Sequence, residues 1–404
     1  MKYIVLVPDG AIDYPLEELG GKTPLEAADT PNMDFIAQNG IIGRTRTIPK
    51  SLLPASDVAN LSIFGYDPEK YYTGRGPLEA ANLGVELSED EIAFRCNLVT
   101  ASEDRMIDYS AGHISTEEAR ALIKTLNENL ATEDLRFYAG VSYRNLLVIR
   151  SPLSEELSKI KCIPPHDITG KDIGENLPEG ETAEILIDLM DKSKQIFQNH
   201  EINKVRIDLK ENPANMIWLW GQGKTPNMPK FKDRFGLEGS VISAVDLIKG
   251  LGKILGLEVI NVKGATGYYD TNYLGKAEAA LKALKEKDFV YLHVEATDEA
   301  GHNGDLQAKI TCIERFDGFV VGTILKNFKK KKNFRILVIP DHATPLSLRT
   351  HTYDEVCFCL AGKGIEKKDF KGFNESEAKK ATFYLENGYE LMDHFIRQKT
   401  LPNK

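Results

Sequence analysis

Five residues in the second half of the sequence have the types and spacing of metal ligands. Asp298 and His302 are four residues apart, so one turn of helix would place both side chains on the same face. Asp341 and His342 follow an apolar run, and His351 comes nine residues after His342. Carboxylates mixed with imidazoles suit Zn, Mn, Fe or Co better than Ca or Mg, which prefer oxygen ligands. The pattern therefore predicts a site for Zn, Mn, Fe or Co.

Asp9 supplies a further carboxylate, because it follows the first apolar run of the chain. Taken singly, each of these residues has an ordinary structural explanation. Asp9 could stabilise the turn before Gly10, Asp298 could cap a helix, and any one histidine could be a hydrogen-bonded core residue. Their coincidence after three separate apolar runs favours metal binding. Since the candidates outnumber the ligands of one tetrahedral site, we expect two metals.

Ser56 is the predicted nucleophile of this site. It lies in the segment 53–62, where Pro54 and Ala55 precede a helix-like run, so Ser56 would stand at a helix N-terminus. Backbone amides and the helix dipole favour a phosphate at that position. Two metals about 4 Å apart can ionise a hydroxyl and clamp a phosphoryl group during in-line displacement. The alternative is that Ser56 is an ordinary helix N-cap.

Three apolar runs must position these groups, at residues 4–7, 290–294 and 336–339. They are largely continuous rather than alternating, which is typical of parallel strands buried on both faces. Helix-like segments at 275–287 and 307–328 lie between them, as in a doubly wound α/β fold. Ligands of such sheets bind beyond the carboxyl ends of the strands, where the acids and histidines stand. We therefore expect the three segments to converge on one site.

Residues 92–236 differ in character from the rest of the chain and are expected to form an inserted domain. Their own strand-like and helix-like runs lie at 94–99, 146–149, 116–129 and 183–199. The predicted architecture is an α/β protein with two domains. Residues 1–91 and 237–404 form a doubly wound, mainly parallel sheet with helices, and residues 92–236 form a smaller inserted α/β domain.

The composition argues against several classes of partner. The net charge of −9 disfavours nucleic acids and anionic membranes, which select for clustered positive charge. The lysine run 329–332 is expected to be a solvated turn. We expect no secretory signal, because the apolar run after Met1 is too short for one, and no membrane helix, because no apolar stretch approaches the roughly 18 residues that it needs. The five cysteines have no C-x-x-C spacing, which suits a protein of the reducing cytoplasm.

Short motifs along the chain resemble those of a known superfamily. In order, they are Val7-Pro8-Asp9-Gly10, Pro54-Ala55-Ser56-Asp57, Asp298-Glu299-Ala300-Gly301-His302, Pro340-Asp341-His342 and Thr350-His351-Thr352. Further blocks of the same kind lie at 74–80, 108–112, 165–170 and 264–268. The set resembles the alkaline phosphatase superfamily and is most similar to the archaeal-type cofactor-independent phosphoglycerate mutases. The resemblance covers nearly the whole chain.

The resemblance implies a glycolytic and gluconeogenic enzyme that interconverts 2-phosphoglycerate and 3-phosphoglycerate without 2,3-bisphosphoglycerate. In this family a metal-bound serine takes the phosphoryl group from one hydroxyl and returns it to the other. The ligands implied by motif position are Asp9, Ser56, Asp341 and His342 for one metal, and Asp298, His302 and His351 for the second. Two divalent ions are expected, with Mn, Zn or Co as the candidates.

The inserted domain of this family closes over the substrate as a lid, which keeps water away from the phosphoserine. Since the substrate carries a phosphate and a carboxylate, we expect cationic residues to bind it, with arginine favoured for bidentate contacts. The candidates are Arg144 first, and then His113, His166, Arg75 and Lys263. Each of them could instead be a surface charge or a structural hydrogen-bond donor.

One position departs from the family pattern. Trp220 stands before Gly221-Gln222-Gly223, where archaeal members tend to carry an arginine. Loss of that guanidinium would weaken the expectation for phosphoglycerate, so a phosphotransferase acting on homoserine is an alternative. A non-catalytic metal-binding homologue is the third reading, and the intact set of serine and ligands argues against it. The expected partner is a small phosphorylated substrate, and the sequence is compatible with a homo-oligomer.

Overall fold

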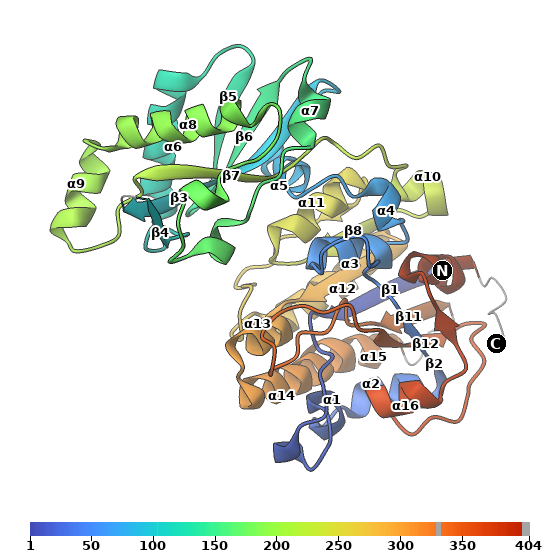
Figure 1. Ribbon diagram of the computed structural model, residues 1–404. Coiled ribbons are helices and arrows are strands. Elements are labelled where there is room, and N and C mark those ends of the chain that lie inside the picture. The colour runs from blue at the N-terminus through green and yellow to red at the C-terminus, as the bar shows by residue number, and fades with distance from the viewer. Residues whose placement is uncertain (103, 329–332, 398–404) are drawn as a thin grey trace. The chain divides into compact units, whose positions relative to one another are not determined.

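The computed structural model describes residues 1–102, 104–328 and 333–397, so the expected turn in the lysine run 329–332 lies outside them. The chain forms two compact units (Figure 1). Unit 1 consists of Met1–Tyr72 and Met228–Lys404, and unit 2 consists of Thr73–Asn227. Residues 73–91 therefore lie in unit 2 and residues 228–236 in unit 1, whereas the sequence placed the domain limits at 92 and 236.

Unit 1 is built on an eight-stranded sheet with the order β13-β2-β12-β11-β1-β10-β8-β9. Its strands are β1 (Lys2–Pro8), β2 (Gly40–Thr45), β8 (Gly239–Ile242), β9 (Glu258–Val259), β10 (Phe289–Val294), β11 (Phe334–Val338), β12 (Val356–Gly362) and β13 (Tyr384–Leu385). β12 is antiparallel to β11 and β2, and the other pairs are parallel. The predicted α/β class with a mainly parallel sheet is confirmed.

The three apolar runs of the sequence are neighbouring strands at the centre of this sheet. β1 pairs in parallel with β10 on one side and with β11 on the other, so Val5 has Tyr291 and Leu337 as its partners. Nearly every residue of these strands is buried, which explains why their sequences do not alternate. Their carboxyl ends therefore lie side by side at one edge of the sheet.

Helices flank both faces of the sheet of unit 1 (Figure 1). The helices are α1 (Pro24–Ala27), α2 (Pro31–Gln38), α3 (Ser56–Ile63), α4 (Pro68–Tyr71), α10 (Phe231–Phe235), α11 (Asp246–Ile254), α12 (Tyr273–Glu286), α13 (Ala296–Asn303), α14 (Leu306–Arg315), α15 (Gly322–Phe328), α16 (Glu375–Lys380) and α17 (Leu391–Arg397). α11 packs on β8 and α3, and α12 packs on β10 and α15. The expected helix at 307–328 is divided into α14, a π-helical segment at Phe316–Val321 and α15.

Unit 2 has an antiparallel sheet in which β3 pairs with three other strands. The strands are β3 (Glu91–Ser102), β4 (Arg105–Asp108), β5 (Leu135–Val141), β6 (Arg144–Arg150) and β7 (Met216–Gly223). The helices are α5 (Gly76–Leu83), α6 (Thr116–Leu130), α7 (Ser154–Ser158), α8 (Ala183–Phe197) and α9 (Glu201–Asp208). Leu122 of α6 and Leu186 of α8 share the core with Phe94 and Trp218 of the sheet. α5 packs on β3, which is why the residues before 92 belong to unit 2.

Two expectations from composition can be compared with this fold. None of the described helices is both long enough and apolar enough to cross a membrane. The five cysteines are free, and all except Cys162 are buried. Cys357 and Cys359 lie in β12, where burial raises the pKa of both thiols and makes them poor nucleophiles and ligands.

Candidate active site

The strand order of unit 1 brings the predicted metal ligands to one edge of its sheet. Asp9 follows β1, and Asp341 follows the end of β11. Asp298 lies in α13, which begins two residues after β10. Because β10, β1 and β11 are adjacent and parallel, these three carboxylates emerge at the same edge.

Three of the candidates form a tight group around Asp298. His302 Nε2 lies 3.2 Å from Asp298 Oδ2, and His351 Nε2 lies 3.4 Å from Asp298 Oδ1. The Nε2 atoms of the two histidines are 2.9 Å apart. The i, i+4 spacing of Asp298 and His302 thus places both on one face of α13, as the sequence indicated. One cation could contact all three side chains.

A second group surrounds Ser56. Ser56 Oγ lies 3.0 Å from His342 Nε2, which is 3.3 Å from Asp9 Oδ1 and 3.6 Å from Asp341 Oδ2. The ring of His342 also lies 4.0 Å from the ring of His351, so the two groups are contiguous. Ligand atoms of Asp9, Asp341 and His293 lie within 4.8 Å of one another. His293 was missed in the sequence because it lies inside β10 rather than beyond its end.

The atoms of this edge suit a bound cation. Asp9 Oδ1 is buried and accepts no hydrogen bond from any residue in the described part of the chain. Burial and the negative charges of Asp341 and Asp298 raise the pKa of Asp9 well above its ordinary value. A buried carboxylate in this position is stabilised by a positive charge at its free oxygen. The donor set of carboxylates, imidazoles and one hydroxyl therefore fits a divalent metal.

Ser56 is the first residue of α3, and the N-cap position belongs to Ala55. The hydroxyl of Ser56 faces His342 rather than a backbone amide of the first turn, so the N-cap alternative does not describe it. Asn60 ties this turn to the ligands, because its Nδ2 donates to Ser56 O and to Asp341 Oδ2, both at 2.7 Å. Asn60 had no sequence signal beyond its place one turn after Ser56.

Thr344 contacts both groups of side chains, the one around Asp298 and the one around Ser56. Its hydroxyl donates to Asp298 Oδ1 at 2.5 Å and lies 3.2 Å from His342 Nδ1. The hydroxyl can accept Nδ1–H from His342, which leaves Nε2 with a free lone pair toward Ser56. Lys309 holds the loop, since its Nζ donates to Thr344 O at 2.8 Å and to Asp13 Oδ2 at 2.6 Å. Thr344 follows the Asp341-His342 motif closely enough to be a sequence candidate, whereas Lys309 does not.

The two histidine environments differ in their protonation. Burial lowers the pKa of His342 to about 4, so its ring is neutral at pH 7 and able to ligate. Burial also acts against protonation of His302, but the hydrogen bond and charge of Asp298 raise its pKa to about 9. A cation that binds His302 must therefore displace a proton.

The predicted substrate residues in unit 2 lie along one aromatic group. The aromatic members are Tyr109, Tyr143 and Trp220. Arg144 lies 5.2 Å above the Tyr143 ring, and His113 is 6.2 Å from that ring. Arg75 lies 5.6 Å above Trp220, and His166 is 5.5 Å from Trp220. The four candidates Arg75, His113, Arg144 and His166 are therefore presented by one surface of unit 2. Lys263 is in unit 1, and its side chain has no hydrogen bond or ion pair with the described strand-end residues.

Arg95 is a further cation of this group that the sequence did not single out. Its guanidinium lies 4.3 Å above Trp220, and its Nε is 2.9 Å from Glu79 Oε1. Burial lowers the pKa of Arg95, Glu79 opposes this change, and the charges of Arg75 and Arg144 add to it. Trp220 therefore has contacts of its own at the position where an arginine is expected. Its indole supports two guanidinium groups, and its Nε1 donates to Asn97 Oδ1 at 3.0 Å.

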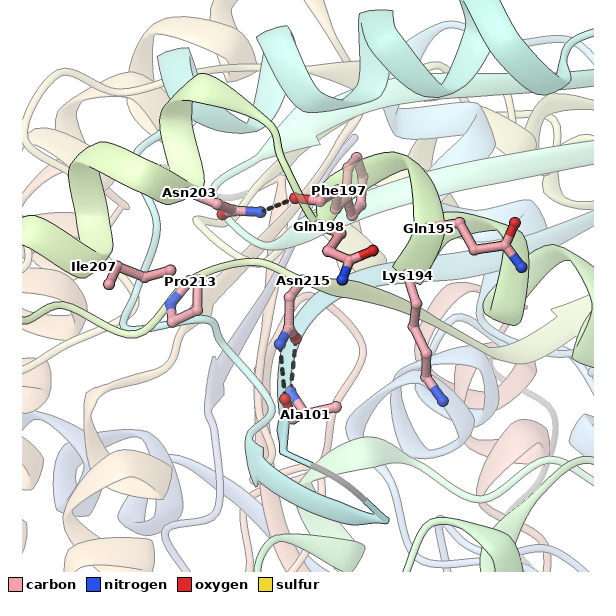
Figure 2. A pocket seen from close by; sticks show the side chains of 9 residues that line it. All are labelled: Ala101, Lys194, Gln195, Phe197, Gln198, Asn203, Ile207, Pro213 and Asn215. Atoms are coloured by element: carbon pink, nitrogen blue, oxygen red, sulfur yellow. Dashed lines mark hydrogen bonds between the residues drawn. The ribbon is translucent and has the colours of Figure 1, made fainter.

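Unit 2 also contains a separate cavity of about 390 Å³ between α8, α9 and the sheet (Figure 2). Figure 2 shows Asn215 in a paired hydrogen bond with the backbone of Ala101, at 2.8 and 2.7 Å, and Asn203 bonded to Phe197 O. None of the predicted site residues lines this cavity. Two of its polar side chains, those of Asn203 and Asn215, hold the surrounding backbone.

Comparisons with known proteins found one family model, several relatives and several solved structures of similar fold. The family model for 2,3-bisphosphoglycerate-independent phosphoglycerate mutase matches residues 37–203. A probable enzyme of this name from Geobacter sulfurreducens is 52% identical and covers 98% of this chain and 100% of its own length. The enzyme of Methanosarcina barkeri is 51% identical, with 99% and 100% covered. Among solved structures, a Pyrococcus horikoshii protein is 32% identical with a TM-score of 0.84, covering 100% of this chain and 99% of its own. The cofactor-independent phosphoglycerate mutase of Thermoplasma acidophilum is 27% identical with a TM-score of 0.68, covering 98% and 100%.

Proposed function

Because the chain belongs to the family of 2,3-bisphosphoglycerate-independent phosphoglycerate mutases, we propose that it moves the phosphoryl group of phosphoglycerate through Ser56 at a two-metal site. The observation that supports this most strongly is the position of Ser56 Oγ, 3.0 Å from His342 Nε2 at the edge where Asp9 and Asp341 meet. Independence from 2,3-bisphosphoglycerate agrees with the family name. The homoserine alternative is not favoured, since the relatives are named as phosphoglycerate mutases.

The proposed metal ligands follow the two groups of side chains. They are Asp9, Ser56, Asp341 and His342 for the first metal, and Asp298, His302 and His351 for the second. When bound, the metals lower the pKa of the serine hydroxyl and neutralise charge on the phosphoryl oxygens. We propose Mn, Co or Zn, since the ligands combine carboxylates with imidazoles.

The residues of the chain perform the transfer in two symmetrical steps. Ser56 Oγ loses its proton and forms a bond to phosphorus as the bond from phosphorus to the glycerate oxygen breaks, and that oxygen takes up a proton. The free glycerate then turns, and its other hydroxyl loses its proton and takes the phosphoryl group back as the bond from phosphorus to Ser56 Oγ breaks and Oγ regains a proton. Asn60 and Thr344 keep the serine and the ligands in place throughout, because both are buried and fully engaged in hydrogen bonds.

We assign recognition of the anionic substrate to the cationic surface of unit 2. Arg75 and Arg144 with His113 and His166 offer donors suited to carboxylate and phosphate oxygens, and the buried Arg95 stacks on the same indole as Arg75. Retention of the glycerate between the two steps requires such contacts, since a released glycerate would leave the phosphoserine to hydrolysis. We place the enzyme in the cytoplasm, in keeping with its free cysteines.

Substitution of the nucleophile tests the proposal. Ser56→Ala should abolish conversion of 3-phosphoglycerate in an enolase-coupled assay while leaving metal content and thermal unfolding close to those of the native enzyme. Ser62→Ala is the matched control, because Ser62 lies in the same helix but is not among the proposed ligands. Mass spectrometry of quenched native enzyme should find phosphate on the peptide that contains Ser56. Substantial mutase turnover by Ser56→Ala would rule the mechanism out.

A further inference from the structure

Three buried ionisable side chains behind the strand-end site have no part in the proposed transfer: His293, Glu295 and Lys276. The side chains of His293 and Lys276 are 0% exposed and that of Glu295 is 4% exposed. Burial of such groups costs free energy unless each finds a partner. Their arrangement in unit 1 therefore suggests a task beyond packing.

The three side chains are connected in series. Lys276 Nζ donates to Glu295 Oε2 at 2.6 Å and to His293 O at 3.1 Å. Glu295 Oε1 accepts from Ser243 Oγ at 2.8 Å and from the backbone amide of Ala244 at 2.7 Å, so the carboxylate is fixed in orientation. The same oxygen lies 3.3 Å from His293 Nδ1. One nitrogen of the imidazole thus faces a carboxylate that cannot turn away.

The other nitrogen of His293 faces two of the proposed ligands. His293 Nε2 lies 3.3 Å from Asp9 Oδ2 and 3.7 Å from Asp341 Oδ2. The opposite oxygen of Asp9, Oδ1, is the one that lies 3.3 Å from His342 Nε2 and lacks a donor among the described residues. His293 therefore contacts Oδ2 of Asp9, whereas Oδ1 of the same carboxylate is the oxygen proposed to face the metal.

We propose that His293 is a positioning residue, which orients Asp9 and Asp341 toward the first metal, and that the Lys276–Glu295 ion pair orients the His293 ring. This inference rests on the proposed two-metal function. Glu295 lies on one side of the ring and the carboxylates of Asp9 and Asp341 lie on the other, so the imidazole has one defined place between them. Asn60 holds Asp341 from another direction, at 2.7 Å, whereas Asp9 depends on His293 for its side-chain contact at Oδ2. Loss of such a partner typically lowers metal affinity by about 10–100-fold.

Metal titration of the full chain tests this role. The native protein, stripped with a chelator, is titrated with Mn²⁺ by calorimetry beside His293→Leu and His293→Gln. We expect two sites in the native protein. His293→Leu should weaken one of them by about 10–100-fold and leave the other within about twofold. His293→Gln should recover part of the loss, because its amide can donate to Asp9. Leu292→Ala is the matched control, since it removes core packing from the same strand without touching Asp9.

The outcomes separate the inference from the function on which it rests. A native protein that binds none of Mn²⁺, Co²⁺ and Zn²⁺ would refute the proposed function and the inference with it. Two native sites with unchanged affinities in folded His293→Leu would refute the inference alone, as would equal weakening of both sites. The absorption spectrum of the Co²⁺-saturated variant should match that of the native protein. A spectrum that reports a lost imidazole would make His293 a ligand instead. If His293→Leu does not fold, Glu295→Gln carries the test, with a smaller loss at the same site expected and native affinity contradicting the proposal.

Discussion

Replacing Trp220 by arginine distinguishes between two interpretations of the departure from the family pattern. The indole lies beneath Arg95 at 4.3 Å and Arg75 at 5.6 Å. A third positive charge there would be repelled by about 4 kcal/mol and about 3 kcal/mol respectively, at an effective dielectric constant of about 20. Glu79 and rotation of the new side chain offset part of this. If they offset half, about 3.5 kcal/mol remains, to which the lost hydrogen bond to Asn97 adds about 1 kcal/mol.

The measurement is urea unfolding followed by the fluorescence of Trp218, which lies buried in the same unit and is retained in the variant. Trp220→Arg should lower the free energy of unfolding of unit 2 by about 4–5 kcal/mol and raise KM for 3-phosphoglycerate. Trp220→Phe is the control, because it keeps an aromatic ring under Arg95 and loses the Nε1–H donor. We expect it to cost about 1 kcal/mol.

A Trp220→Arg enzyme with native stability and a higher kcat/KM would show that this position is suited to a guanidinium. It would also show that the support of Arg95 and Arg75 by the indole is incidental. The departure would then mark a weakened clamp for phosphoglycerate rather than a different way of building one.

The remaining predictions concern the metals, the proposed substrate contact of Arg144 and one partly buried acid. Chelation should inactivate the enzyme, and Mn²⁺, Co²⁺ or Zn²⁺ should restore it without 2,3-bisphosphoglycerate. His302→Ala and His351→Ala should each reduce the elemental content of the same site, whereas full occupancy in both would contradict their grouping with Asp298. Arg144→Ala should impair transfer from 3-phosphoglycerate far more than hydrolysis of a neutral aryl phosphate, and equal losses would place Arg144 outside substrate recognition. Burial raises the pKa of Glu375 from 4.5 to about 7, so its contribution to stability is complete below pH 4.5 and lost as the pH rises through 7. Glu375→Gln should therefore match the native protein near pH 4 and be more stable at pH 8 by up to about 3 kcal/mol, and an unchanged pH dependence of unfolding would exclude this explanation.

The sequence can predict that Asp9, Asp298 and Asp341 lie close together, because this follows from local patterns. Each comes soon after a strand whose continuous apolar sequence indicates burial in a parallel sheet, and the ends of such strands lie together. The spacing of His302 adds a helical turn, which is equally local. The membership of residues 73–91 was not open to prediction in this way, since α5 joins unit 2 through its packing on β3.

The side chains that hold the ligands had no comparable signal. Lys309 is 296 residues from its partner Asp13, and His293 is 284 residues from Asp9. In a sequence, a lysine in a helix or a histidine in a strand suggests a solvated or core position. A buried polar residue must be paired, but the rule does not say with which distant segment. Arg95 escaped notice for the same reason, since its neighbour Trp220 lies in another strand of the sheet.

The order of strands in unit 1 has a consequence for how the protein is made on the ribosome. β1 emerges first, but its two neighbours are β10 and β11, so roughly 280 residues must follow before it can pair. At about 5–20 residues per second this wait is roughly 15 to 60 s. Unit 2 is continuous in sequence and can fold during that interval, while β1 and the helix that carries Ser56 remain without their final partners. The nucleophile is therefore among the first parts of the site to be synthesised, and it meets His342 only after most of the chain has left the ribosome.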